Sequence, residues 1–275
     1  MTHDDKDPTP AHDDFDWQAV LSDTSPEMRR HRRFFKYIPR EPRCKICAAP
    51  FEGPGAPFMR ALGRSRWAKN PNFCRICEVF LSKHPGGAEV ELTFLFADIR
   101  GSTGLGESMS TTEFSGLLNR FYAVGSKVIV AHDGIVDKYV GDEIVAMFAP
   151  PFAGPAHASQ AVAAARNLLA STGHGTPAGP WAPIGVGIHT GLAFVGSVGE
   201  GGMTDFTALG DSVNTTARLA SIAAAGEILV SRAASEAAGL PGEGFEQRHL
   251  ELRGRTEPVD VLVLRATDTR ERVSA

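Results

Sequence analysis

Hydrophobic and polar residues follow two periods along this chain, and the changes between them predict where strands and helices lie. Segments in which apolar residues alternate with polar ones or run together, bounded by Gly and Pro, are typical of strands. Segments with apolar residues every three or four positions are typical of helices. The predicted strands are 90–98, 134–140, 143–149, 184–191 and 192–199, and the predicted helices are 111–132, 155–172 and 211–225.

The order of these segments is strand, helix, strand, strand, helix, strand, with additions at the C-terminus. This order predicts an α+β fold of the ferredoxin-like (βαββαβ) class. In that topology the first and third strands are antiparallel neighbours at the centre of the sheet. Asp98 ends the first strand and Asp142 precedes the third, so we expect these two residues to lie side by side at one edge.

The turn between the second and third strands carries charge in the middle of an apolar run. Within VDKYVGDEIVAMF, residues 136–148, the Gly141–Asp142 pair is typical of a tight hairpin turn. Asp137 and Glu143 flank the key positions, and we interpret both as surface or hairpin-end carboxylates without a catalytic role.

Composition narrows the range of functions. The chain has 275 residues, 43% of them hydrophobic, which is enough for one catalytic domain and a small module. A net charge of -4 gives no overall attraction to nucleic acid, and no apolar run approaches the roughly 18 residues of a membrane span. The acidic N-terminus lacks the pattern of a signal peptide. We therefore expect a cytoplasmic protein without a membrane partner.

Three regions are predicted along the chain. They are a disordered acidic tail at 1–26, a cysteine-bearing module at 27–84 and a large domain at 88–268, with a Pro-Gly-Gly turn before the large domain. The segment 28–43 is basic and contains aromatic residues. It could bind an anionic surface, but a solvated helix face is the favoured interpretation, and a nucleic-acid partner is unlikely.

Two carboxylates at one sheet edge repel each other unless a cation neutralises them. Oxygen ligands such as Asp98 and Asp142 suit Mg²⁺ or Mn²⁺. The loop IRGSTG, residues 99–104, follows directly, and its backbone N–H groups could hold phosphate oxygens. Asn214 and Arg218 project from one face of a predicted helix, where Arg suits a phosphoryl group and Asn a sugar oxygen. These features together indicate a nucleoside triphosphate site.

Three segments resemble the class III adenylyl/guanylyl cyclase catalytic domain in the expected order, over residues 88–266. They are FLFADIRGSTGLGE, DKYVGDEIVAMF and IGVGIHTGLAFVGSVGEGGMTDFTALGDSVNTTARLA. The resemblance implies that two Mg²⁺ or Mn²⁺ ions per active site bind Asp98 and Asp142, and that Asn214 and Arg218 stabilise the transition state. The ribose 3′ oxygen would attack the α-phosphorus and pyrophosphate would leave. Residues implied to bind the triphosphate are Ile99, Gly101, Ser102 and Thr103, with Arg255 as a further cation and Arg253 as its alternative.

The resemblance also assigns base selection to Lys138 and Thr207. Lys can donate to adenine N1 and the Thr hydroxyl can accept from the N6 amino group, whereas guanine requires the opposite pattern. Guanylyl cyclases typically have Glu and Cys at these positions, and Thr is associated with the class IIIb subgroup. The resemblance therefore implies ATP as the substrate and allows stimulation by bicarbonate.

Active sites of this family are composite, with the metal aspartates from one subunit and Lys, Thr, Asn and Arg from the other. This chain carries the whole set once, so the resemblance implies a head-to-tail homodimer with two equivalent sites. A monomer should be nearly inactive.

All four cysteines lie in two CxxC motifs, Cys44 with Cys47 and Cys74 with Cys77. This spacing predicts a tetrahedral metal site; structural Zn²⁺ is favoured, and iron, an iron–sulfur cluster or redox-active pairs are alternatives. The residues between the motifs have little periodic apolar content, so a metal is expected to supply much of the module's folding energy. Structural support for dimer packing is preferred over a role as a redox or metal sensor.

Three alternative functions share features with this sequence. VGDEIVAMF also resembles the GGDEF signature of diguanylate cyclases, but that family does not account for Lys138 or for ALGDSVNTTAR. A guanylate cyclase would differ at the two base-selecting positions. A catalytically silent dimerisation domain with a zinc-containing, nucleic-acid-binding module is the third alternative. Loss of a metal-binding Asp or of Arg218 would have indicated it, and all of these residues are present.

Overall fold

The computed structural model describes residues 16–22, 24–26, 30, 42–44, 46–68, 71, 73–84, 86–199, 205–252 and 257–266. Residues 1–15, most of the basic segment 28–43, and both Arg253 and Arg255 lie outside these ranges, so the expectations for them remain predictions.

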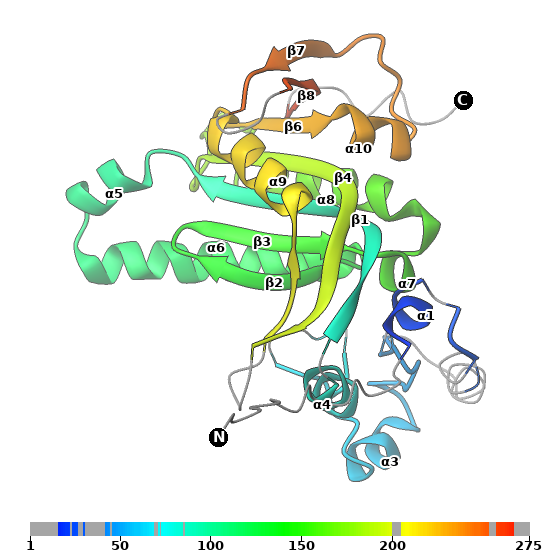
Figure 1. The fold of residues 1–275 in the computed structure, drawn as a ribbon. Helices are drawn as coiled ribbons and strands as arrows, with labels where there is room; N and C mark the ends of the chain where they lie inside the picture. The colour runs from blue at the N-terminus through cyan, green and yellow to red at the C-terminus, as the bar shows by residue number, and fades with distance from the viewer. Residues whose placement is uncertain are drawn as a thin grey trace, which may run out of the picture.

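Eight strands form one mixed sheet (Figure 1). Their bounds are β1 (Gly86–Ile99), β2 (Ile135–Val140), β3 (Glu143–Phe148), β4 (Ile184–Val198), β5 (Asp205–Leu209), β6 (Glu227–Ser231), β7 (Glu246–Leu250) and β8 (Val259–Arg265). The order across the sheet is β2-β3-β1-β4-β6-β8-β7, and β5 pairs with β4 outside this path. The predicted α+β class and the central position of the first strand are confirmed.

β1 pairs antiparallel with β3 on one side and with β4 on the other. Asp98 stands opposite Glu143, which places Asp142 in the turn beside the end of β1. β4 is a single strand of 15 residues where the sequence predicted two. Gly191 stands opposite Leu92 and the ladder continues through it, so this glycine does not break the strand.

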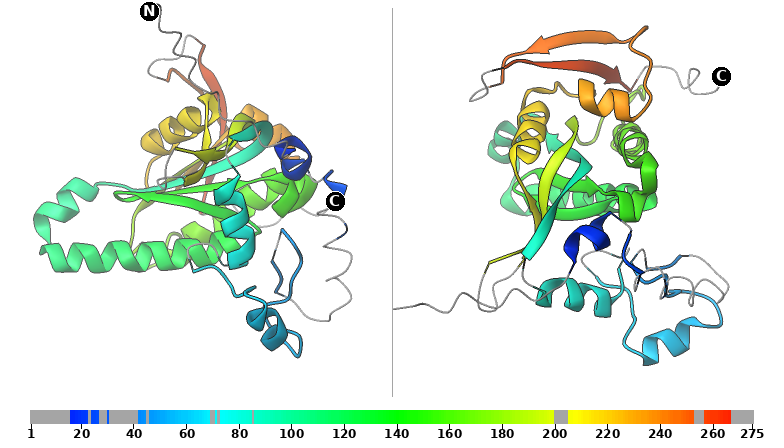
Figure 2. Two further views of the ribbon diagram at one scale, coloured as in Figure 1. Left: turned by 60° about the horizontal axis from the view of Figure 1, so that its bottom comes forward. Right: turned by 45° about the vertical axis from the view of Figure 1, so that its right-hand side comes forward.

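Helices lie on both faces of the sheet (Figure 2). The side chains of β1 alternate between these two layers. One set packs with α6 (Thr111–Ala131) and α8 (His157–Ser171); it consists of Leu95, Ala97 and Ile99. The other set faces α9 (Asp211–Ile222) and the N-terminal module; it consists of Leu92, Phe94 and Phe96. Because successive side chains of a strand point to opposite faces, Asp98 belongs to the layer of α9.

Shorter helices complete the layers. They are α5 (Ser102–Ser108), α7 (Pro150–Ala153), the 3₁₀ helix η1 (Gly154–Ala156) and α10 (Arg232–Ala237). The three long predicted helices are confirmed as α6, α8 and α9. Among the described residues, no helix combines the length and apolar character that crossing a membrane requires.

The N-terminal module contains α1 (Trp17–Leu21), α3 (Ala56–Ala61) and α4 (Arg75–Lys83) and lies against one end of the sheet (Figure 1). The prediction of a disordered tail to residue 26 is wrong for α1. Trp17 and Leu21 are buried, and the ring of Trp17 stacks on Phe206 of β5 at a centroid distance of 6.0 Å. A helix of five residues is too short to give a periodic signal, and contacts with the sheet stabilise it.

Candidate active site and metal centre

Asp98 and Asp142 come together at one end of β1. The backbone N–H of Ile99 donates to the carbonyl oxygen of Asp142 over 3.3 Å. Gly141 forms the turn with a φ of 61°, a conformation that glycine adopts without steric cost. Both carboxylate side chains are partly exposed. The expected side-by-side placement of these two residues is confirmed.

Tyr122 of α6 holds the turn that carries Asp142. Its hydroxyl donates to the carbonyl oxygen of Gly141, and its ring stacks on Tyr139 at a centroid distance of 4.3 Å. Burial and the charge of Asp142 raise the pKa of Tyr122. Helical periodicity shows which face a residue occupies but not its partner, so the sequence pattern does not reveal this role of Tyr122.

Arg100 provides a cation at the same edge. Its guanidinium forms an ion pair with Asp98, and Nη1 donates to the carbonyl oxygen of Ser221 in α9 over 2.6 Å. Glu143 is half-buried, and its burial and the charge of Asp142 raise its pKa to about 7. Among the described residues, three carboxyl groups and the Arg100 guanidinium therefore lie at this edge, and hard oxygen ligands of this kind fit a divalent cation such as Mg²⁺.

The loop after β1 leads into α5 as expected. Gly101 has a φ of 70° and precedes the helix, which begins at Ser102. Gly101 and Thr103 are exposed and follow Asp98 by three and five positions in the chain. Ile99 is only 1% exposed, so only its backbone is available to a phosphate group.

α9 packs unusually close to β4 because glycines remove the side chains between them. A Cβ atom at Gly187 would lie 2.4 Å from the backbone nitrogen of Ala220 and 2.7 Å from the carbonyl oxygen of Thr216. Asn214 and Arg218 lie one turn apart on this helix, the first exposed and the second half-buried. The close contact with β4 sets the position of both side chains relative to the sheet.

β2 and β5 bring Lys138 and Thr207 into direct contact. Lys138 Nζ donates to Thr207 Oγ1 over 2.9 Å, and the Thr207 hydroxyl donates to Asp137 Oδ2 over 2.9 Å. Asp137 and Thr207 are each 5% exposed, so the interpretation of Asp137 as a surface carboxylate is wrong. Burial raises the pKa of Asp137, and the Lys138 ammonium and the Thr207 hydroxyl oppose that rise.

The matched region of the chain decides its family. Residues 88–263 match the family described as the adenylate and guanylate cyclase catalytic domain, and this segment is more than half of the chain. The chain belongs to the adenylate and guanylate cyclase family.

Individual relatives of this cyclase domain include enzymes of both specificities. Adenylate cyclase 1 of Rhizobium meliloti is 36% identical over 146 residues, which are 50% of this chain and 22% of that protein. The structure of the guanylyl cyclase Cya2 is 28% identical with a TM-score of 0.58, covering 65% of this chain and 93% of that one. The structure of the adenylyl cyclase CyaB from P. aeruginosa is 28% identical with a TM-score of 0.56, covering 68% of this chain and 98% of that one. The chain spans only 22–32% of the length of the first curated relatives that it matches.

The four cysteines gather beside the cyclase domain. All four are buried free thiols, and their sulfur atoms lie within 4.8 Å of one another. Cys47 Sγ and Cys74 Sγ are 3.9 Å apart, and a tetrahedral site with metal–sulfur distances of about 2.3 Å has sulfur–sulfur separations of about 3.8 Å. The predicted grouping is confirmed, and the cluster fits a single tetrahedral ion.

Arg64 contacts the four-cysteine cluster, a role that the sequence pattern does not reveal. Its Nη1 donates to Cys47 Sγ over 3.2 Å, and the backbone N–H of Cys74 donates to Cys44 Sγ over 3.3 Å. Donors of this kind stabilise thiolates, which are the metal-binding form of cysteine. Arg64 lies between the two CxxC motifs without a spacing signal that would distinguish it from its neighbours.

The four-cysteine cluster and the cyclase sheet share one hydrophobic core. The cluster that contains the cysteines continues into Phe94 and Val195 of the central strands. Phe73, next to the second CxxC motif, packs edge-on against Phe152 of α7 at a centroid distance of 5.1 Å. The small apolar content of the module is therefore supplemented by the face of the sheet.

Proposed function

We propose that this chain is an adenylate cyclase that converts ATP to 3′,5′-cyclic AMP and pyrophosphate. The observation that carries the proposal is the contact between Lys138 and Thr207, 2.9 Å from ammonium to hydroxyl oxygen. The ammonium has donors for adenine N1, and the hydroxyl oxygen can accept from the N6 amino group. Guanine carries a carbonyl oxygen and a ring N–H at these positions, so this pair disfavours it.

The remaining residues take the roles that the family resemblance gives them. Asp98 and Asp142 would hold two Mg²⁺ or Mn²⁺ ions, which lower the pKa of the ribose 3′ hydroxyl and neutralise the triphosphate when bound. Backbone N–H groups around Gly101 bind phosphate oxygens. Arg218 stabilises the negative charge that develops on the α-phosphate, and Asn214 orients the ribose.

We further propose that two chains associate head-to-tail, so that each active site takes its aspartates from one chain and Lys138, Thr207, Asn214 and Arg218 from the other. A closed pair of this kind has two equivalent sites. The four-cysteine cluster is proposed to bind structural Zn²⁺. Its position in a core shared with the sheet supports a structural role over a sensor role.

The first test is incubation of the purified full-length chain with ATP or GTP and Mg²⁺ or Mn²⁺, followed by chromatography of the products. We expect cyclic AMP from ATP at a higher rate than cyclic GMP from GTP. Preferential formation of cyclic GMP would favour a guanylate cyclase, a specificity that also occurs among the structural relatives. A folded, metal-loaded dimer that forms neither product would favour the catalytically silent alternative.

A second experiment exchanges the base-selecting pair. We expect the double variant Lys138→Glu with Thr207→Cys to prefer GTP, because Glu accepts from the guanine ring N–H and amino group and Cys no longer favours the adenine amino group. The measurement is kcat/KM for each nucleotide. Unchanged preference for ATP in a folded, active double variant would contradict the assignment.

A further inference from the structure

Asp137 is a buried carboxylate that none of the proposed catalytic steps uses. One of its oxygens, Oδ2, accepts from the Thr207 hydroxyl and lies 3.3 Å from Lys138 Nζ. The other, Oδ1, is buried and has no hydrogen-bond partner within the described part of the chain. A buried carboxylate is costly to keep, and this one contacts both residues that are proposed to select the base.

A β-bulge explains how two adjacent residues reach the same partner. In a regular strand, neighbouring side chains point to opposite faces. The pairing of β2 with β3 shifts register between Val136 and Lys138, which leaves Asp137 as the extra residue. Bulges redirect side chains in this way and are frequent beside active sites. Both Asp137 and Lys138 consequently contact Thr207 of β5.

The hydrogen bonds of Thr207 determine what its hydroxyl can offer to a base. A hydroxyl group has one hydrogen and two acceptor positions. The hydrogen is donated to Asp137, and one acceptor position receives the Lys138 ammonium. Only an acceptor position is left. A threonine without such a neighbour could rotate its hydrogen toward guanine O6 as readily as it could accept from adenine N6.

We propose that Asp137 is a specificity-determining positioning residue, which fixes the Thr207 hydroxyl as an acceptor and thereby favours adenine over guanine. This inference rests on the proposed function and extends it from the base-selecting pair to a triad. Asp137 acts through Thr207 and does not contact the nucleotide. Its substitution is therefore predicted to change the ratio of kcat/KM for ATP over kcat/KM for GTP. This change requires the hydroxyl of Thr207.

The test is a double-mutant cycle in the full-length chain with Asp137→Asn, Thr207→Val and the double variant. Asn has the same shape as Asp but can present an N–H, which allows the threonine hydroxyl to turn. We expect Asp137→Asn to lower the ratio of kcat/KM for ATP over GTP about tenfold, the effect of one discriminating hydrogen bond. In the Thr207→Val background the same substitution should change the ratio less than about twofold, because no hydroxyl is left to orient.

Two matched variants separate this role from a structural one. Thr207→Ser keeps the hydroxyl and should keep the effect of Asp137→Asn. Glu243→Gln removes an exposed carboxylate in the segment before β7 and should leave the ratio unchanged. A merely structural Asp137 would reduce kcat/KM for both nucleotides equally. An unchanged ratio in Asp137→Asn, or an equal change in the Thr207→Val background, would overturn the inference.

Binding of 3′-deoxy-ATP and 3′-deoxy-GTP, which lack the attacking hydroxyl, provides a readout without turnover. If the wild-type chain forms no cyclic nucleotide, the proposed function fails. The effect of Asp137→Asn on the ratio of the two dissociation constants still tests the inference in that case. Equal effects on both constants would overturn it, and weaker discrimination would support it.

Discussion

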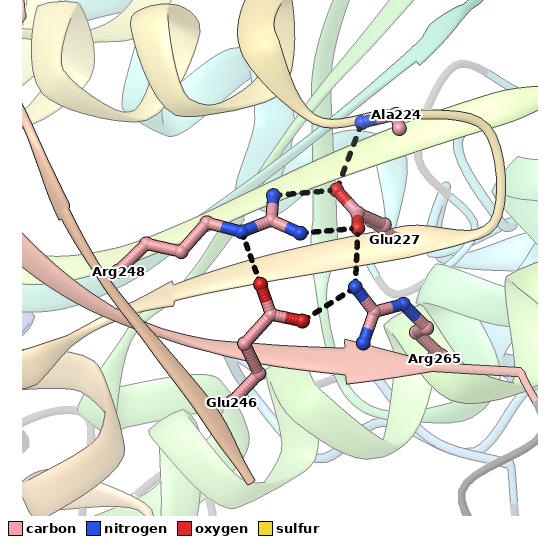
Figure 3. A network of polar contacts seen from close by, with 5 residues as sticks. All are labelled: Ala224, Glu227, Glu246, Arg248 and Arg265. Atoms are coloured by element: carbon pink, nitrogen blue, oxygen red, sulfur yellow. Dashed lines mark hydrogen bonds and ion pairs between the residues drawn. The ribbon is translucent and has the colours of Figure 1, made fainter.

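At the scale of single residues, Glu227 shows how one buried carboxylate connects three strands (Figure 3). Arg248 of β7 donates to both of its oxygens, over 2.9 and 2.7 Å, and Arg265 of β8 donates to one over 2.8 Å. Glu246 accepts from both arginines and closes the network. These bonds lower the pKa of Glu227 to about 2.

This pKa predicts how stability depends on pH. The carboxylate has an ordinary pKa near 4.5 in the unfolded chain, so its stabilising effect is complete above that value and is lost as the pH falls toward 2. We expect a loss of about 3 kcal/mol in the free energy of unfolding over this range. Urea denaturation at several pH values measures it. The free energy of unfolding should depend less steeply on pH in Glu227→Gln. It should keep the wild-type dependence in Glu236→Gln, which removes an exposed carboxylate. The same slope in wild type and Glu227→Gln would contradict the assignment.

At the scale of elements, the packing of α9 on β4 depends on Gly187. A Cβ atom at this position would approach backbone atoms of α9 to less than 3 Å, and backbone atoms cannot rotate away. We expect Gly187→Ala to push α9 from the sheet, to lower the free energy of unfolding by about 2 kcal/mol and to reduce cyclase activity, because Asn214 and Arg218 move with the helix. Chemical denaturation and product formation measure the two effects.

Gly116→Ala in α6 is the matched control for this prediction. A Cβ atom there would meet nothing within 4 Å, so the substitution should stabilise the chain slightly by improving helix propensity. If Gly187→Ala were as stable and as active as Gly116→Ala, the close contact would not be required for the position of α9.

The strands and long helices of the cyclase domain could be predicted from the sequence, because each has a periodic apolar face that the sheet or its helices bury. Asp137 could not be assigned correctly. Its environment depends on a bulge and on a strand about 70 residues away, and neither leaves a periodic signal in the chain. Tyr122 and Arg64 were missed for the same reason, since their partners are a backbone carbonyl and a thiol brought close only by the fold.

At the scale of the whole molecule, the cysteine cluster and the cyclase sheet are expected to lose stability together when the metal is removed. The cysteines belong to the same hydrophobic cluster as residues of β1 and β4. Elemental analysis should find one metal ion bound by the cysteines of each chain. The element found, zinc or iron, identifies the ion. Chelation should lower the unfolding temperature by at least about 10 °C, because a bound structural metal contributes more than about 3 kcal/mol and a chain of this size loses roughly 2–4 °C per kcal/mol. Added Zn²⁺ should restore the midpoint; an unchanged midpoint after complete metal removal would show that the thiols alone hold the core.

The proposed composite arrangement of two chains predicts the activity of mixtures of inactive variants. Asp98→Ala removes a proposed metal ligand, and Arg218→Ala removes the group proposed to stabilise the α-phosphate. In a head-to-tail dimer these residues belong to different halves of each site. A heterodimer of the two variants therefore has one intact site and one site that lacks both Asp98 and Arg218. Random pairing makes half of the dimers heterodimers, and the mixture should reach about a quarter of wild-type activity.

A mixture of Asp98→Ala with Asp142→Ala is the matched control. In the proposed dimer both substitutions affect the same half of the site, so every site in every dimer lacks one of the two aspartates and no activity should return. Recovery only in the first mixture would establish that each site needs two chains. Failure of the first mixture, with exchange of subunits verified by differently tagged chains, would instead place Asp98 and Arg218 in the same half of the site.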